Sequence, residues 1–196
     1  FVKDQVKHQP NEMSKGKLYS EQEVIYQVEH TINVTKHDLM HDMILEDDTQ
    51  NWIKDTGETL AAGSTYESTS VDKQSFDQLL GENGKIQIID QKDQEIACIT
   101  KDTNLDAQGN YQITYPDATE IIKIKMSEIQ KDGFLKIVNQ KKLKQEDSYT
   151  TSDKQAFTQL ETIATLQYTD ANSKANFVHE SSHMQWLDTK TAAHMS

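Results

Sequence analysis

The sequence contains no arginine, and all 20 of its basic residues are lysine. Arginine captures phosphate or carboxylate with two parallel hydrogen bonds, so its absence argues against a nucleotide-type site. Cys98 is the only cysteine, which excludes a framework of internal disulfides. No apolar run approaches the length that crosses a bilayer. These absences predict a soluble globular module without disulfides.

The charge balance is strongly acidic. Against the 20 lysines stand 32 Asp and Glu residues, which gives a formal net charge of −12. Binding to nucleic acid requires clustered basic side chains, and a helix on a membrane surface also needs a basic face. The acidic composition therefore argues against both nucleic acid and a membrane surface as binding partners. Hydrophobic residues make up 35% of the 196 residues, enough for a thin core in one domain or two small ones.

Apolar and polar residues alternate with a period of two along much of the chain, which predicts β-strands. In residues 24–34 the even positions would share one face of a long strand: Val24, Tyr26, Val28, His30, Ile32 and Val34. Met43, Leu45 and Asp47 share a face in the next strand. Further strands are predicted at 64–71, 85–90, 94–100, 110–115, 119–126, 133–139, 157–168, 175–187 and 190–196. Many short strands with little helix indicate an all-β sandwich.

One short helix interrupts this pattern near 72–80. Asp72 is its expected N-cap, its apolar side contains Phe76 and Leu79, and Gly81 ends it. The glycine-containing segment 81–84 is the best boundary between an N-terminal lobe, 1–82, and a C-terminal lobe, 83–196. A single domain fits the same pattern.

The string HESSH matches the zinc-peptidase pattern H-E-x-x-H through His179, Glu180 and His183. On a helix the two histidines would bind zinc and the glutamate would act as general base, with His194 as a candidate third ligand. The surrounding residues favour a strand instead, and only 13 residues follow His183. Surface histidines without a metal are the competing interpretation.

Two other strings contain metal-type ligands. His37 and His41 lie four residues apart in a short connection, where a solvated loop is the simpler interpretation. Residues 102–113 imitate a calcium loop, but Ala107 replaces the expected glycine and Ile113 replaces the closing glutamate. A polar hairpin with Gly109 at its tip explains the same residues. We therefore predict no cofactor, with zinc or calcium as alternatives.

The order of the strands resembles a known family. The strings FVKDQV, EVIYQVEHTINV and LMHDMILEDDT resemble the opening of repeat domains in Gram-positive wall-anchored adhesins. GNYQITYPDATEIIKIKMSEIQKDGFLKIVNQKKL and LDTKTAAHMS also resemble such repeats, so the likeness covers most of the chain. It implies an immunoglobulin-like β-sandwich and an extracellular, cell-wall-anchored location, with the anchor outside this segment.

The resemblance also implies a candidate isopeptide site, because many family members join a lysine to an Asn or Asp side chain. Lys3 would be the lysine and Asp47 the buried acid–base helper. The reaction needs an apolar pocket that keeps the lysine neutral and the carboxylic acid protonated. Thr162 stands at the acceptor position and faces inward, beside Glu161, which faces outward. The bond is therefore absent or uses another acceptor, and an Asp47 that merely ends its strand is the alternative.

Three functional hypotheses follow. The first is a non-catalytic adhesin or stalk module that projects or presents a binding region, with neighbouring repeats and a host or surface ligand as partners. The second is a zinc metallopeptidase built on HESSH. The third is a carbohydrate- or protein-binding module, for which an exposed aromatic side chain would be the sign. Trp52 and Trp186 are the only tryptophans, and Trp52 is either exposed or an anchor of its loop.

Overall fold

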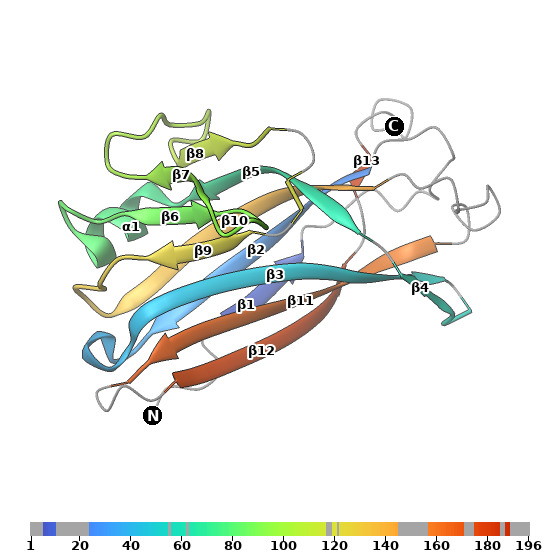
Figure 1. Cartoon of the computed structure of the whole chain (residues 1–196), viewed down its shortest axis with the longest axis horizontal. Coiled ribbons are helices and arrows are strands. Elements are labelled where there is room, and N and C mark those ends of the chain that lie inside the picture. The colour runs from blue at the N-terminus through green and yellow to red at the C-terminus, as the bar shows by residue number, and fades with distance from the viewer. Residues whose placement is uncertain are drawn as a thin grey trace.

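The computed structural model describes residues 6–10, 24–54, 56–61, 63–116, 119–120, 122–144, 157–170, 175–184 and 187–188. Within these ranges the chain forms two antiparallel β-sheets, a short 3-10 turn, η1 (His37–Leu39), and one α-helix, α1 (Lys73–Leu80). The sheets form two layers and α1 lies at one end of them (Figure 1). The predicted all-β sandwich is confirmed.

The first sheet has the strand order β1-β2-β10-β5-β8, and β13 also pairs with β2. Its strands are β1 (Val6–Pro10), β2 (Val24–Val34), β10 (Gly133–Leu143), β5 (Ser64–Val71), β8 (Tyr111–Thr114) and β13 (Leu187–Asp188). The second sheet has the order β12-β11-β3-β9-β6-β7, and β4 also pairs with β3. Its strands are β12 (Ala175–Met184), β11 (Phe157–Thr169), β3 (His41–Lys54), β9 (Lys123–Met126), β6 (Ile86–Ile89), β7 (Glu95–Ile99) and β4 (Thr59–Ala61).

Strands from both halves of the chain are mixed in both sheets. β10 lies between β2 and β5, and β3 lies between β11 and β9. A boundary at 82–83 would therefore divide each sheet between two lobes. Within the described residues, strands from both sides of residue 82 contribute to each of the two sheets.

The core lies between the layers and follows the alternation. In β2 the side chains of Tyr26, Val28, His30, Ile32 and Val34 are buried, while the odd positions from 25 to 33 are half-buried. Val24 belongs to β2, but its side chain lies outside the described residues. Antiparallel sheets with one solvated face produce this pattern, because successive side chains point to opposite faces.

Helix α1 covers one end of the core. Its N-cap is Asp72, whose carboxylate accepts a hydrogen bond from the Ser75 backbone N–H at 2.9 Å. Phe76 packs against Tyr111 of β8 with ring centroids 5.1 Å apart. The Tyr111 hydroxyl donates to Asp77 at 2.7 Å, which ties the helix to the sheet. The predicted helix and cap are confirmed. Among the described residues, no helix has the length and apolarity required to span a membrane.

Candidate functional site

The most unusual feature of the core is a buried polar group that we call the Asp47 cluster: Asp47, His30, Tyr66, Asn139 and Lys141. All five residues are at most 4% exposed. Asp47 belongs to β3 in the second sheet, whereas the other four come from β2, β5 and β10 in the first sheet. The cluster therefore joins the two layers of the sandwich.

Strand parity explains why these side chains meet. Asp47 follows Met43 and Leu45 on the inward face of β3, as the alternation predicts. On β10, Asn139 and Lys141 occupy inward positions in the same series as Leu135, Ile137 and Leu143. Since side chains on one face of a strand recur every second residue, both polar groups must enter the core.

Both carboxylate oxygens of Asp47 accept hydrogen bonds. Oδ1 accepts from the Lys141 ammonium at 2.9 Å and from the Tyr66 hydroxyl. Oδ2 accepts from the Asn139 side-chain amide at 2.7 Å and lies 2.7 Å from Nε2 of His30. An ionised carboxylate can only accept, so His30 Nε2 carries the proton in this bond.

The charges of Asp47 and Lys141 stabilise each other. Burial alone would raise the pKa of Asp47, but the Lys141 ammonium and the hydrogen bonds from His30 and Tyr66 hold that pKa well below its usual range. Burial alone would lower the pKa of Lys141, but the Asp47 carboxylate raises it above its usual value. Both residues are therefore ionised at neutral pH.

A second ring of contacts holds the cluster in place. The Thr69 hydroxyl donates to Oδ1 of Asn139 at 2.6 Å and accepts from the Tyr115 hydroxyl at 2.5 Å. The Lys141 ammonium lies 4.6 Å from the centroid of the Tyr66 ring, within the range of a cation–π contact. The ammonium is thus surrounded by a carboxylate and aromatic faces, which compensate for part of its lost hydration.

This arrangement stabilises the charged forms of Asp47 and Lys141. Attack of an amine on a carboxyl group needs a neutral amine and a protonated acid. The Asp47 cluster favours the opposite states, an ammonium and a carboxylate, in close contact. Its hydrogen bonds and its ion pair connect Asp47 of the second sheet to side chains of the first sheet.

The other residues of the candidate isopeptide site are placed only in part. Lys3 lies outside the described residues. Thr162 is buried on β11 and Glu161 is half-buried, in agreement with the predicted parity. Ala164, two residues beyond Thr162, pairs directly with Asp47. Glu161 instead accepts a hydrogen bond from the Asn51 side-chain amide at 2.8 Å.

HESSH lies in β12 and is extended. His179 pairs with Thr165, Glu180 with Ala164 and His183 with Glu161 of β11. Two positions four apart are separated by roughly 13 Å along a strand, whereas one turn of helix brings them together. The helical geometry of H-E-x-x-H is therefore not formed. The side chains of β12, and all of His194, lie outside the described residues.

The connection containing His37 and His41 is hydrogen-bonded to the segment that precedes β10. His37 Nδ1 lies 2.6 Å from Asp132, and His41 Nδ1 lies 2.9 Å from Glu128. The hydrogen bond to Glu128 raises the pKa of His41. Each histidine thus has its own carboxylate partner. In the described part of the chain, no three His, Cys, Asp or Glu side chains gather as a metal site would require.

The calcium-like segment is a polar turn. Gly109 has a φ of +81° and its N–H donates to the Asp106 carbonyl at 3.0 Å. Oδ1 of Asp106 accepts from the backbone N–H groups of Gln108 and Asn110, both at 2.9 Å. Such side-chain bonds to the backbone two residues on define an Asx turn. For Trp52, the backbone belongs to β3, and its side chain, like all of Trp186, lies outside the described residues.

The sequence analysis missed Lys141, Asn139 and Tyr66 as partners of Asp47. A signal was present, since Asn139 and Lys141 continue the inward series of Leu135 and Ile137. The predicted strand stopped at residue 139, whereas β10 continues to Leu143. Extending the parity by two positions identifies the buried lysine.

Comparison with known proteins gave matches among solved structures. No protein-family model and no curated protein matches the sequence. One similar structure is the collagen-binding subdomain of the Enterococcus faecalis surface protein ACE, with a TM-score of 0.42, 11% identity, and 94% of this chain and 99% of that chain covered. Another is the collagen-binding domain of a Staphylococcus aureus adhesin, with a TM-score of 0.39, 10% identity, and the same two coverages. Collagen binding is a property of those two proteins.

Proposed function

We propose that this chain is a non-catalytic extracellular module of a bacterial cell-surface protein, which projects or presents a binding region. The proposal agrees with the resemblance of its strand strings to wall-anchored adhesin repeats. It also agrees with a sandwich that has no disulfide framework, because Cys98 is the only cysteine. A projecting module must resist a pull between its two ends.

The observation that carries this proposal is the placement of the first and last described strands along β2. β1 pairs with β2 from Ile32 to Val28, and β13 pairs with the same strand at Ile25 and Val24. Both are antiparallel to β2. β1 therefore begins beside the C-terminal end of β2, and β13 ends beside its N-terminal end (Figure 1). A pull between β1 and β13 runs along the strand axis and loads the bonds that join β1 and β13 to β2 in shear, because those bonds lie perpendicular to the strands.

The Asp47 cluster reinforces the same strand. His30 lies in β2 opposite His8 of β1 and Ile137 of β10, and its side chain bonds to Asp47 of the other layer. Load on β2 is thereby shared with β3. We propose that the ion pair between Asp47 and Lys141, which we call the ionic crosspiece, links the two sheets in place of the isopeptide bond that the resemblance implies. Both residues are held in their charged states, which do not react to form such a bond.

Single-molecule pulling tests the proposal. The chain is linked in tandem with a reference module of known unfolding force and is stretched through its two termini. We expect unfolding at a force well above that of the Asp47→Asn variant, which removes one charge of the crosspiece. Asp102→Asn makes the same change at an exposed position between β7 and β8, away from the Asp47 cluster, and as the matched control it should keep the wild-type force.

Two results would contradict the proposal that this module resists a pull along β2. One is a wild-type unfolding force below that of the reference module. The other is an equal unfolding force in wild type and Asp47→Asn, which would show that the Asp47–Lys141 ion pair does not contribute to this force. His30→Leu provides a second variant, because it keeps the charges of Asp47 and Lys141 and removes the hydrogen bond that links β2 to Asp47.

A further inference from the structure

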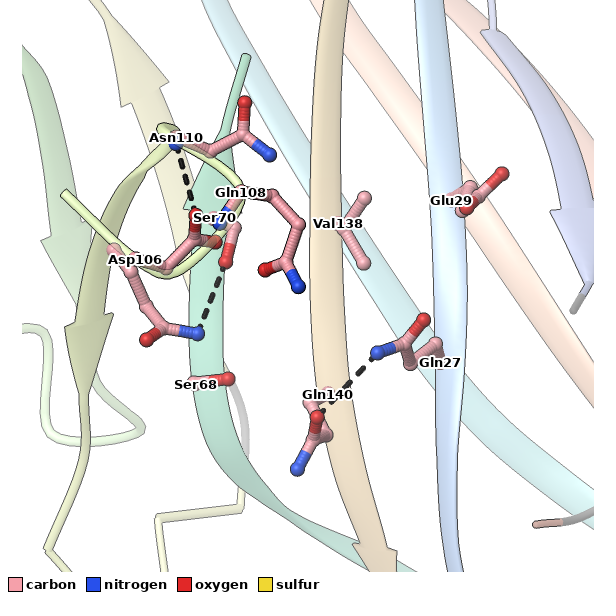
Figure 2. A pocket seen from close by; sticks show the side chains of 10 residues that line it. Gln27, Glu29, Ser68, Ser70, Asp106, Gln108, Asn110, Val138 and Gln140 are labelled. Atoms are coloured by element: carbon pink, nitrogen blue, oxygen red, sulfur yellow. Dashed lines mark hydrogen bonds between the residues drawn. The ribbon is translucent and has the colours of Figure 1, made fainter. Parts of the chain in front are cut away.

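An open groove crosses the outer face of the first sheet, on the side away from the Asp47 cluster. It has a volume of about 400 Å³ and extends over β2, β10, β5 and β8, with the Asp106–Asn110 turn as one wall (Figure 2). We call it the outer groove. Adjacent strands lie about 4.8 Å apart, so the groove spans roughly 14 Å from β2 to β8.

The lining of the outer groove is rich in side-chain amides. Four of these residues, Gln27, Gln140, Gln108 and Asn110, are seen in Figure 2, and Gln112 also lines the groove. Each side chain ends in a planar group that both donates and accepts hydrogen bonds. Ser68 and Ser70 of β5 also line the groove and add two hydroxyl groups to these amides. Such a surface suits a ligand that is itself both donor and acceptor at every position.

Two of the hydrogen bonds between side chains of the groove are long. Gln27 donates to Gln140 at 3.4 Å, and Gln112 donates to Ser70 at 3.3 Å, both near the outer limit of a hydrogen bond. The wall, in contrast, is rigid, because Oδ1 of Asp106 is bonded to two backbone N–H groups of its own turn. These two long hydrogen bonds, beside a turn held by its own hydrogen bonds, can be exchanged for bonds to a ligand's hydroxyls.

Charge limits the class of ligand. Glu29 and Asp106 are the charged residues of the lining, and the chain carries a net charge of −12. An anionic ligand would be repelled, which excludes phosphate- and sulfate-rich molecules. A second hollow of about 250 Å³ continues the groove past Lys136 and Asp72, where the charges are of opposite sign. A neutral polar ligand therefore matches the groove.

A peptide ligand fits less well. Peptides bind sheets by pairing with an open edge or by filling side-chain pockets. β10 and β5 are already paired on both sides, so their backbone groups are engaged. Val138 is the one apolar side chain in the lining, which offers little surface for a side-chain pocket.

We propose that the outer groove binds a short neutral oligosaccharide through its amide, hydroxyl and carboxylate side chains. Vicinal sugar hydroxyls donate and accept in pairs, as the planar amides do. The absence of an aromatic residue among the lining residues of this groove means that hydrogen bonds supply the contacts, so we expect affinity in the millimolar range. This inference goes beyond the proposed function, because a projecting module need bind no ligand itself.

Nuclear magnetic resonance titration of the whole chain tests the inference. The probes are maltotriose, cellotriose and triacetylchitotriose, with a sulfated disaccharide and a neutral linear peptide for comparison. Side-chain amide groups give their own resonances, so the five amides of the groove report directly. We expect at least one neutral trisaccharide to shift these resonances in a saturable manner.

Substitutions then locate the site. Gln140→Ala and Gln108→Ala should each weaken binding about tenfold, as expected for one hydrogen-bonded contact. Gln94→Ala makes the same change at an exposed position of the β6–β7 turn, outside the groove lining, and should leave binding unchanged. The backbone spectrum of each variant shows whether its fold is intact.

Four outcomes would overturn the inference. They are no shift with any neutral trisaccharide, shifts outside the groove, equal or stronger binding of the peptide or sulfated sugar, and binding that neither groove substitution weakens. None of them bears on the pulling experiment, so the proposed function and this inference fail independently.

Discussion

Asp47 illustrates how one buried charge constrains the surrounding residues. A one-residue slip of β10 would turn Lys141 to the outer face, because successive side chains alternate. Asp47 would then remain in the core without its cation. Leaving a buried charge uncompensated costs several kcal/mol, so the Asp47 cluster disfavours every register except the observed one.

Removing the cation should therefore be strongly destabilising. We expect Lys141→Met to lower the free energy of unfolding by about 3–5 kcal/mol, measured by urea denaturation at neutral pH. The flexible apolar side chain of Met has a similar length, so the loss reports mainly on the buried Asp47 charge. Lys136→Met, on the exposed face of the same strand, should change stability by less than about 0.5 kcal/mol.

A double-mutant cycle separates the pair from packing. Asp47→Asn combined with Lys141→Met removes both charges and should cost clearly less than the sum of the two single changes. Additive single effects would mean that the two side chains do not interact and would contradict the ionic crosspiece.

The same pair predicts a dependence of stability on pH. The pKa of Asp47 is lowered in the folded state, so its contribution is present above the usual value of 3.8 and is lost as the pH falls through the lower folded value. The pKa of Lys141 is raised, so its contribution is present below 10.5 and is lost as the pH rises through the folded value.

We expect the difference in stability between wild type and Lys141→Met to be largest at neutral to mildly alkaline pH, and to shrink both in acid and above about pH 10. Acid relieves the variant, because its unpaired Asp47 can take up a proton. Urea denaturation across this range measures the difference. A difference that stays the same down to about pH 2 would show that Asp47 is not ionised in the folded protein.

At the scale of single elements, helix α1 is the clearest local structure. It has eight residues, shorter than an isolated helix needs for stability in water, so its cap and its packing decide whether it forms. Phe76, Leu79 and Leu80 are buried against the core, and Asp72 satisfies the backbone N–H of Ser75.

Loss of the cap should weaken the end of the sandwich that α1 covers. We expect Asp72→Ala to lower the free energy of unfolding by about 1 kcal/mol, because the Ser75 N–H loses its partner. Asp72→Asn keeps an accepting oxygen at the cap and should cost much less. Thermal unfolding of the three proteins measures this, and equal losses in both variants would assign the effect to charge and not to capping.

At the scale of the whole molecule, the sandwich is a product of long-range pairing. β2 and β10 are about a hundred residues apart in the chain and form adjacent strands, as do β3 and β11. The same pairing aligns β1 and β13 on β2 and brings β3 against the first sheet through Asp47. The resistance to a pull along β2 that we propose would therefore be a property of the assembled sheets, not of one segment.

The intact mass of the denatured chain tests the crosspiece at this scale. We expect the full mass of the sequence, because an ion pair leaves no covalent mark. Condensation of Lys141 with the Asp47 carboxyl would release one water, and reaction of a lysine with an asparagine would release one ammonia. A mass short by either molecule, measured by high-resolution mass spectrometry and traced by peptide mapping to Lys141 or Asp47, would contradict the ionic crosspiece.

Much of the fold follows from local patterns. The alternation identified the inward faces of β2 and β3 and the burial of Thr162, because strand parity depends only on the neighbouring residues. The same parity applied to β10 identifies Lys141 once its length is known. The boundary at 82–83 was suggested by a turn signal, and a turn at 81–84 does join α1 to β6, but a turn does not reveal which strands pair across it.

The amino-acid sequence by itself determined the all-β class, the single capped helix, the acidic charge and the inward position of Asp47, since each depends on composition or on residues a few positions apart. Only the tertiary structure decided that Asp47 meets Lys141, that HESSH lies extended in β12, and that five amides line one groove. These features depend on contacts between strands far apart in the chain. Such contacts are selected by the total burial and hydrogen bonding of the folded sandwich, which no local segment encodes.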